Sequence, residues 1–440
     1  MSFSALRRSP WFALAALTIT FSVGFVDRQI LNLLVQPIKA DFGLSDLEIS
    51  LLQGAAFSIA YLVMSPVFGR WVDVSGRRRI LLGCIAVWSV FTAACGFTRS
   101  FGALFAARSG VGAAEAGLTP SSWSLLSDLF DEKRLARALS IYNMGPYIGS
   151  GLALLLGGVV IEWATRADLS AVPVIGALAP WQITFVIVSA LGLVCIAMVA
   201  AMREPPRGAA DPGQTDSPPP LTLGEALSIL WAHRGFYGYF YIGMALAIIP
   251  IYAFPAWLPT VAIRQYGVSI GQVGMTYGLL TLVGGSLGVL TGPTLGRWLA
   301  RAGYPDANMR LGVISALAVF ACCAALLMRS GYEMVLAIGG IISFCYSIPT
   351  AMAATALQVV TPNRMRGLAS SLYIVLVTLM GLGIAPVTVA FLTDKVFRDE
   401  LRVGDSLGIV CAVSALLSCG ALWLSLKAYR RLILDPIRLA

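Results

Sequence analysis

The sequence predicts an all-α polytopic membrane protein with twelve transmembrane helices in two six-helix, pseudo-symmetric halves. Three observations predict this fold class: an apolar composition, a series of apolar windows of bilayer-spanning length, and an internal repeat. Of the 440 residues, 58% are hydrophobic and 12% are charged. Soluble domains carry roughly 25% charged residues, so a water-soluble core does not account for this composition.

Apolar windows recur along the whole chain. About 20 apolar residues in a helix cross a hydrocarbon core of ~30 Å, and a helix satisfies its own backbone hydrogen bonds there. Twelve windows fit this length: 11–37, 47–69, 79–98, 101–127, 137–161, 181–202, 235–263, 271–295, 310–328, 333–360, 367–392 and 405–426. The first is too long for a signal-peptide apolar region and has no small-residue cleavage site before Asp27, so we expect it to be retained.

The distribution of Lys and Arg predicts the orientation. If the N-terminus is cytoplasmic, 21 of the 31 Lys and Arg residues lie on the inner side and 8 on the outer side. This excess is typical of cytoplasmic loops, so we expect both termini to be cytoplasmic and the lipid bilayer to be the main partner. The net charge of +9 follows from this topology and requires no nucleic-acid partner. The eight cysteines all lie within spans, without the loop spacing of a disulfide framework or zinc site, so no metal is expected.

A proline-rich segment separates six spans from six. We predict an N-terminal bundle over residues 1–202, a cytoplasmic linker over 203–234 and a C-terminal bundle over 235–440. In the linker, Leu223, Leu227, Leu230 and Trp231 recur at helical spacing, and Thr222 with Glu225 fits a capping box. A short amphipathic helix on the inner face is one interpretation, and a linker disordered throughout is the other.

The two halves repeat each other. Residues 66–76 read PVFGRWVDVSG and residues 293–303 read PTLGRWLARAG, with five identities in eleven at equivalent loops. A second match aligns the Arg-Ala-Leu-Ser that begins at Arg137 with the Arg-Gly-Leu-Ala that begins at Arg366. The chain is therefore predicted to be a tandem duplication. Parallel repeats with a site near the midplane are typical of rocking carriers.

The loop from Gly69 to Arg79, Gly-Arg-Trp-Val-Asp-Val-Ser-Gly-Arg-Arg-Arg, resembles the signature loop of the major facilitator superfamily. This resemblance implies the major facilitator fold. It also implies a cytoplasmic gate motif of Gly69, Asp73, Gly76 and Arg77, in which the acidic residue faces the start of span eleven when the cytoplasmic side is closed. The alternative is that the arginines only fix the orientation.

Inserting a charged side chain at the bilayer centre costs at least ~2.5 kcal/mol. A charged residue inside a membrane span is therefore a functional candidate. Asp27 and Arg28 lie in span one, and Arg108 and Glu115 lie two turns apart in span four. We predict proton coupling by Glu115, Asp27 and Arg28, with the proton as the coupling ion and no cofactor. Arg28 is expected to pair with Glu115 until an anionic substrate group competes for it, with Arg108 as a second holder. A fixed interhelical salt bridge is the alternative.

Residues 23–53 and 108–130 resemble the first and fourth spans of Spinster-like transporters. The residues that carry this resemblance are Asp27-Arg28, Gly43 to Asp46, Gly112 to Ala116, Pro120 and Asp128 to Phe130. It implies proton-coupled transport of an amphiphilic substrate of the sphingolipid or lysophospholipid class. Organic-anion symporters of the same superfamily are similar in these spans too, so small organic anions are the alternative cargo. The short tails suggest a bacterial inner-membrane member, which we expect to be a monomer.

The second half supplies aromatic residues. Tyr346 and Tyr373 in spans ten and eleven are predicted to bind the substrate together with Arg28, Arg108 and Glu115, although membrane aromatics often face lipid instead. The chain is not expected to be an enzyme, because its only histidine, His233, lies in the linker. A channel or a membrane scaffold is the remaining alternative to a transporter.

Overall fold

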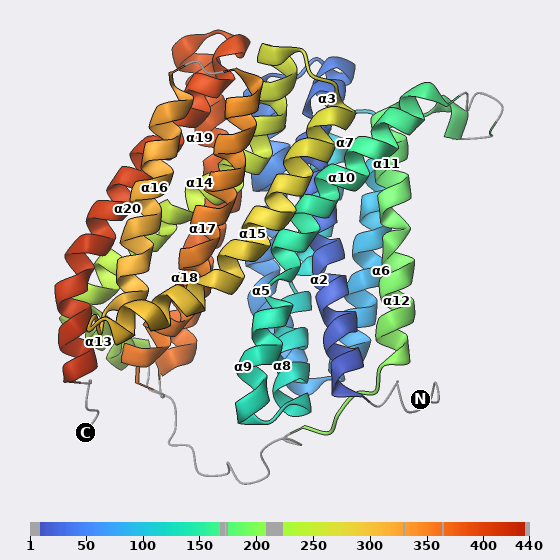
Figure 1. The fold of residues 1–440 in the computed structure, drawn as a ribbon. Helices are drawn as coiled ribbons and strands as arrows, with labels where there is room; N and C mark the ends of the chain where they lie inside the picture. Colours follow the sequence, from blue (N-terminus) through green and yellow to red (C-terminus); the bar gives the residue numbers. More distant parts are fainter. Residues whose placement is uncertain are drawn as a thin grey trace. The chain divides into compact units, whose positions relative to one another are not determined.

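The computed structural model describes residues 9–167, 172, 175–207, 223–328, 331–362 and 365–435, and these residues form helices and short connections (Figure 1). Eleven helical stretches of the described chain are long and apolar enough to cross a membrane, and each overlaps one predicted window. The twelfth window, 101–127, is covered by two shorter helices in succession. The all-α, twelve-span architecture is therefore confirmed.

Contacts divide the chain into two compact units. The first contains residues 1–215 and 267–282, and the second contains residues 216–266 and 283–440. The division after residue 215 falls inside the predicted linker. Residues 267–282, which include the first part of helix α15 (Ile270–Arg301), pack with the first unit, although the sequence assigned them to the C-terminal bundle.

The elements of the first unit follow one another with short connections. They are α2 (Pro10–Leu33), α3 (Val35–Phe42), α4 (Asp46–Ser50), the π-helical turn η1 (Leu51–Ala55), α5 (Ala56–Val74), α6 (Arg77–Cys95), α7 (Phe101–Glu115), α8 (Leu118–Leu129), α9 (Glu132–Tyr142), α10 (Gly145–Arg166), the 3-10 turn η2 (Ile175–Ala177), α11 (Pro180–Ser189) and α12 (Leu191–Ala201).

The predicted span 101–127 is divided into α7 and α8, each too short to cross a bilayer alone. Pro120 has no N–H to donate to the carbonyl of Ala116, and its ring clashes with that turn. Gly117 lies between the two helices, and glycine has a low helix propensity. A larger residue would not fit there, because a Cβ would lie 2.6 Å from the sulfur of Cys84. The interruption therefore follows directly after Glu115, which becomes the last residue of α7.

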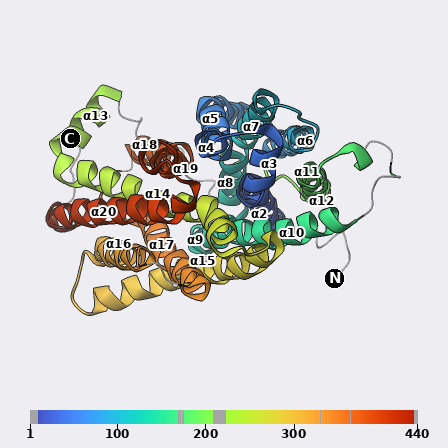
Figure 2. The same cartoon turned by 90° about the horizontal axis from the view of Figure 1, so that it is seen from above.

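Helix α2 is central to the first unit. It packs along α10, while α7 packs between α5 and α6. Seen from above, α5 and α7 lie on one side of α2 and α10 lies on the other (Figure 2). Two glycines make these approaches close: a Cβ on Gly149 of α10 would lie 2.2 Å from the carbonyl oxygen of Ser22, and one on Gly112 of α7 would lie 2.3 Å from that of Phe57.

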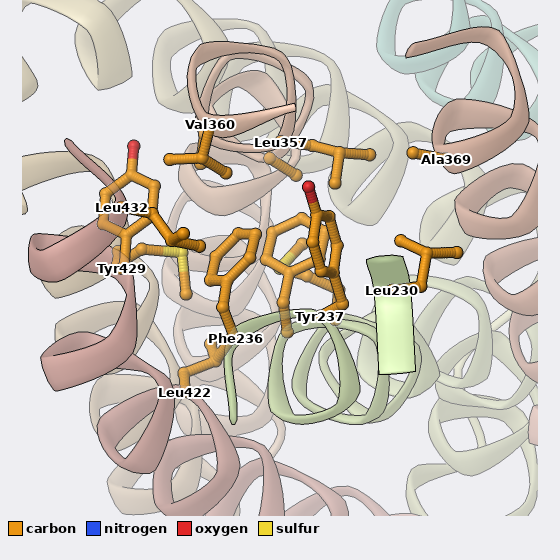
Figure 3. Packing of buried hydrophobic residues seen from close by; sticks show 14 of the residues in the cluster. Leu230, Phe236, Tyr237, Leu357, Val360, Ala369, Leu422, Tyr429 and Leu432 are labelled. Carbon is orange, nitrogen blue, oxygen red and sulfur yellow. The ribbon is translucent and has the colours of Figure 1, made fainter. Parts of the chain in front are cut away.

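The second unit contains the remaining helices and the later part of α15. They are α13 (Leu223–Ala232), α14 (Arg234–Tyr266), α16 (Ala307–Leu326), α17 (Tyr332–Val360), α18 (Arg366–Thr378), the π-helical turn η4 (Leu379–Ile384), α19 (Ala385–Phe391), the π-helical turn η5 (Leu392–Phe397), the 3-10 turn η6 (Glu400–Arg402) and α20 (Val403–Leu434). Helix α20 contacts both α14 and α16. Phe236, Tyr237 and Tyr429 lie in the buried core of the second unit (Figure 3).

Helix α13 occupies the linker segment for which a short amphipathic helix was one expectation. Ala226 and Leu230 are buried against the core of the second unit, whereas Leu227 and Trp231 are exposed by 46% and 72%. Thr222, the expected capping residue, lies outside the described residues.

We expect Gly112→Ala to lower the thermal unfolding midpoint of the purified protein, measured by tryptophan fluorescence in detergent. The added methyl group meets the backbone of Phe57, and overpacking of this kind costs ~1–3 kcal/mol. Gly102→Ala on the same helix is the control, because a Cβ there meets nothing within 4 Å and alanine favours the helix. Equal midpoints for the two variants would contradict the close packing of α5 and α7.

Candidate functional site

An ion pair lies inside the first unit between Arg28 of α2 and Glu115 of α7. Both Nε and Nη2 of Arg28 are 2.7 Å from Oε2 of Glu115. The exposed fractions of the two side chains are 8% and 0%. The second carboxylate oxygen, Oε1, is buried and has no hydrogen-bond partner among the described residues. Sequence analysis predicted this pairing.

Three aromatic rings surround the guanidinium of Arg28. Its central carbon lies 4.6 Å from the ring centroid of Phe25, 4.5 Å from that of Phe57 and 5.3 Å from that of Tyr61. Rings at these distances attract a cation through their quadrupoles, more strongly where water is excluded. The cage therefore stabilises the positive charge without forming a second ion pair.

Helical periodicity explains the cage. Phe57 and Tyr61 are four residues apart and share one face of α5, and Phe25 is one turn from Arg28 on α2. The carboxylate packs against α2 at Gly24, where a Cβ would lie 3.4 Å from Oε2 of Glu115, an ordinary van der Waals contact. The carboxylate lies at the C-terminal end of α7, where the helix dipole opposes a negative charge, so it depends on Arg28 for its partner.

Arg108 and Asp27 lie beside this pair but make different contacts. Nη1 of Arg108 donates to the backbone carbonyl of Asp27 at 3.0 Å, and Nη2 donates to that of Arg28 at 3.3 Å. The hydroxyl of Thr92 donates to Oδ2 of Asp27. The structure thus brings all four predicted charges together, with Arg108 bound to the backbone of α2. Two formal positive and two formal negative charges are buried in one cluster.

Three buried amides extend the site along α2, and sequence analysis missed them. Nδ2 of Asn32 donates to Oε1 of Gln29, and Nε2 of Gln53 donates to Oδ1 of Asn32 at 3.2 Å. All three side chains are at most 6% exposed. Each of the three is a polar residue inside an apolar window. An amide carries no formal charge, so these residues do not stand out as the four charged ones do.

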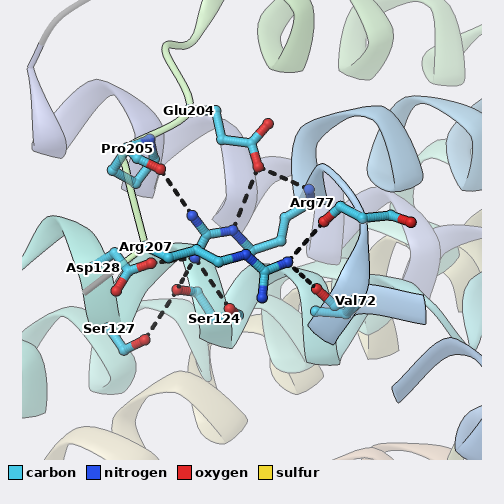
Figure 4. A network of polar contacts seen from close by, with 9 residues as sticks. Val72, Arg77, Ser124, Ser127, Asp128, Glu204, Pro205 and Arg207 are labelled. Atoms are coloured by element: carbon cyan, nitrogen blue, oxygen red, sulfur yellow. Dashed lines mark hydrogen bonds and ion pairs between the residues drawn. The ribbon is translucent and has the colours of Figure 1, made fainter. Parts of the chain in front are cut away.

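The predicted gate motif lies at the junction of α5 and α6 (Figure 4). Arg77 pairs with Asp128 at the end of α8 and donates its backbone N–H to Oε1 of Glu204 at 2.8 Å and Nη2 to the carbonyl of Pro205 at 2.8 Å. Its side chain is 2% exposed. Arg207 donates to the carbonyls of residues 72 and 75. Asp128 and Glu204 are partners that sequence analysis did not identify.

The other residues of the motif are less informative. A Cβ on Gly69 would meet nothing within 4 Å, and one on Gly76 would lie 3.6 Å from Glu204. The side chain of Asp73 lies outside the described residues, so its predicted contact with span eleven stays a prediction.

Tyr346 of α17 and Tyr373 of α18 belong to the second unit. Tyr346 is buried and donates to the hydroxyl of Ser343 at 3.4 Å, and the ring of Tyr373 lies 5.9 Å from that of Phe240. Phe240 also lines a small pocket with Met244, Asn308 and other residues of this unit. Among the described residues, no group of three or more His, Cys, Asp or Glu side chains is arranged to hold a metal ion.

A family model described as Major Facilitator Superfamily matches residues 16–386. An MFS-type efflux pump of Mycolicibacterium smegmatis is 26% identical over 439 residues, covering 98% of this chain and 96% of the pump. Human protein spinster homolog 1 is 26% identical over 408 residues, covering 86% and 72%. The hexuronate transporter of Escherichia coli K12 is 25% identical over 307 residues, covering 66% of each chain.

The fold is also similar to a solved structure. A bacterial homolog of the human lysosomal transporter Spinster, in an inward-facing and unoccupied conformation, superimposes with a TM-score of 0.79 at 23% identity, covering 98% of this chain and 99% of that one. At this level of identity the likeness establishes the fold alone.

We expect Asp128→Asn to lower the thermal unfolding midpoint, because it removes one of the two carboxylates that pair with the buried Arg77. Leaving a buried charge without any partner costs ~3–5 kcal/mol, and with Glu204 still 3.4 Å from Nε of Arg77 we expect a smaller loss. Asp131→Asn is the matched control, since Asp131 and its partner Arg134 are 57% and 68% exposed and exposed pairs contribute ~0–1 kcal/mol. Melting of both variants in parallel checks this, and an Asp128→Asn midpoint no lower than that of the control would refute the structural role of Arg77.

Proposed function

Because the chain belongs to the major facilitator superfamily, whose members are transporters rather than enzymes, we propose that it is a proton-coupled secondary transporter of an anionic amphiphile. The proposed substrate class is sphingolipid or lysophospholipid, moved by alternating access. The observation that carries this proposal is the ion pair of Arg28 and Glu115, enclosed by aromatic rings and isolated from water.

Charge neutrality supplies the coupling. Each charge of this pair has lost hydration worth several kcal/mol, and the close opposite charge offsets much of this loss. An anionic substrate group that binds Arg28 releases Glu115 from its partner. A carboxylate left alone in an apolar site binds a proton. The empty site therefore holds Arg28 with charged Glu115, and the loaded site holds Arg28 with the anion beside protonated Glu115.

The two states carry the same net charge, so one proton accompanies each anionic group. The unpartnered Oε1 of Glu115 is available to receive it. Asp27 is a second proposed proton carrier, because its Oδ1 is also buried without a hydrogen-bond partner among the described residues. Arg108 fixes the backbone of α2 at Asp27 and Arg28, and it stays a proposed second holder of the anion.

The amphiphilic class rests on the likeness to the spinster homologs and on the apolar surroundings of Arg28. Tyr346 and Tyr373 are proposed to contact the apolar part of the substrate. Small organic anions are the second candidate, favoured by the likeness to the hexuronate transporter and by the buried amides next to Arg28. We expect a monomer in a bacterial inner membrane, with both termini cytoplasmic.

We expect Glu115→Gln to abolish proton-driven accumulation in proteoliposomes while exchange of substrate across the membrane continues. The amide imitates the protonated carboxyl, so residue 115 stays neutral, as it is in the loaded site. The variant can therefore bind the anion at Arg28 but cannot take up or release a proton. The measurement is uptake of radiolabelled lysophosphatidylglycerol and of D-glucuronate under an imposed pH gradient, with counterflow in its absence.

Glu333→Gln, at an exposed glutamate at the start of α17, is the control and should accumulate substrate as the wild type does. Gradient-driven accumulation by Glu115→Gln equal to that of the wild type would overturn the proton assignment. Flux that never saturates would indicate a channel, and no flux of either compound in the wild type would favour a scaffold.

A further inference from the structure

One ring of the aromatic cage differs from the other two. The centroids of all three rings lie within 5.3 Å of the central carbon of the Arg28 guanidinium. Phe25 and Phe57 are buried, whereas Tyr61 is partly exposed. Tyr61 therefore covers the guanidinium on the side that a solute can approach, and the two phenylalanines cover it on buried sides.

The exposure of Tyr61 does not follow from a position on the outer face of α5. At about 100° per residue, Tyr61 falls on the face of the helix that carries three buried side chains, those of Phe57, Phe68 and Val72. The exposed apolar residues of α5 lie on another face, at Ile59, Val63, Val67 and Trp71. The buried face of α5 thus opens at Tyr61, next to Arg28.

The hydroxyl of Tyr61 makes no hydrogen bond to any residue that the structure describes. Two tyrosines of the second unit show the usual arrangement, in which the hydroxyl of Tyr237 pairs with Thr361 and that of Tyr241 donates to the carbonyl of residue 369. A phenylalanine at position 61 would cover the guanidinium equally well, because the attraction comes from the ring. The cage therefore does not account for the hydroxyl.

An anion held by Arg28 would need further hydrogen bonds. A buried ion pair is favourable only where additional donors satisfy the remaining lone pairs of the anion, and such charge-assisted bonds are stronger than bonds between neutral groups. Phe25 and Phe57 have no polar atom to offer. A phenol is a donor, and the one at Tyr61 lies on the open side of the cage.

We infer that Tyr61 is a substrate-binding residue whose hydroxyl donates a hydrogen bond to the anionic group held by Arg28. The anion then has one oxygen on the guanidinium and another on the phenol. This inference rests on the proposed function, because it places the substrate anion on Arg28. It adds α5 to the site, whereas the predicted binding residues lie on α2, α7, α17 and α18.

The ligand chemistry is an anionic group with at least two free oxygens. A carboxylate on a small organic acid and a phosphodiester in a lysolipid headgroup share this chemistry. The test is calorimetric binding of D-glucuronate and of lysophosphatidylglycerol to the purified full-length wild type and to Tyr61→Phe. The probe that the wild type binds shows which of the two sources supplies the anion.

Tyr61→Phe keeps the ring over Arg28 and removes only the hydroxyl. We expect the variant to bind each probe that the wild type binds about tenfold more weakly, because a hydrogen bond to a charged group is lost. The unfolding midpoint of the empty variant should equal that of the wild type, since the hydroxyl bonds to no described residue. The variant should still take up about one proton per anion, because Glu115 is unchanged.

Tyr142→Phe is the matched control. Tyr142 belongs to the same unit and stacks on Phe21 with ring centroids 4.5 Å apart, but its side chain is fully buried. A solute does not reach its hydroxyl, so this variant should bind both probes as the wild type does. Equal losses of affinity in the two tyrosine variants would overturn the inference. Unchanged affinity in Tyr61→Phe would also overturn it, and a lower unfolding midpoint would then assign the hydroxyl a packing role.

Arg28→Gln separates this failure from failure of the proposed function. We expect it to weaken binding more than Tyr61→Phe does, because it removes the charge that attracts the anion. Unchanged binding by Arg28→Gln, or no binding of either probe by the wild type, would refute the anion site and the role of Tyr61 together. Weakened binding by Arg28→Gln with wild-type affinity in Tyr61→Phe would refute the role of Tyr61 alone.

Discussion

A guanidinium and a carboxylate that are both buried lose hydration worth several kcal/mol each, and Arg28 and Glu115 offset this loss only by facing each other at 2.7 Å. Arg28 also lies among three aromatic rings, and Arg108 beside the pair binds backbone carbonyls of α2. Under the proposed function, an event that takes Arg28 away from Glu115 supplies both an anion and a proton. The proposal thus gives this packing interaction a role in coupling.

Several unrelated features of the chain keep the pair in this arrangement. Gly112 allows α7 to reach the backbone of α5, which brings the ring of Phe57 to the guanidinium. The fourth span is interrupted directly after Glu115, near Pro120. Arg108 fixes the carbonyls of residues 27 and 28 on α2.

The sequence was sufficient to predict what depends on composition and on strong local rules. The apolar windows and the pairing of Arg28 with Glu115 follow from the cost of exposing backbone and charge to lipid, and the repeat is visible as identities between the two halves. What depends on three-dimensional packing was not predictable. Helical spacing placed Arg108 and Glu115 on one face of span four, but only the structure shows Arg108 bound to carbonyls of α2. The partners of Arg77 lie 51 and 127 residues away, beyond any local pattern.

The amide cluster illustrates a different limit. Gln29, Asn32 and Gln53 carry no formal charge, so a search for expensive groups passes over them, although a buried amide also needs a partner. Their connection depends on the register of η1 against α2, which no periodicity in the sequence specifies. The buried charges were therefore predictable, whereas the neighbouring amides were not.

The exchange of a proton for the Arg28 contact is tested most directly by counting protons during binding. Calorimetric titration of the purified protein with lysophosphatidylglycerol or D-glucuronate, in buffers of different ionisation enthalpy, gives the number of protons taken up per anion bound. We expect about one proton for the wild type and none for Glu115→Gln, because charge neutrality at Arg28 requires this exchange. Binding with no proton uptake by the wild type, or with the same uptake by both proteins, would contradict it.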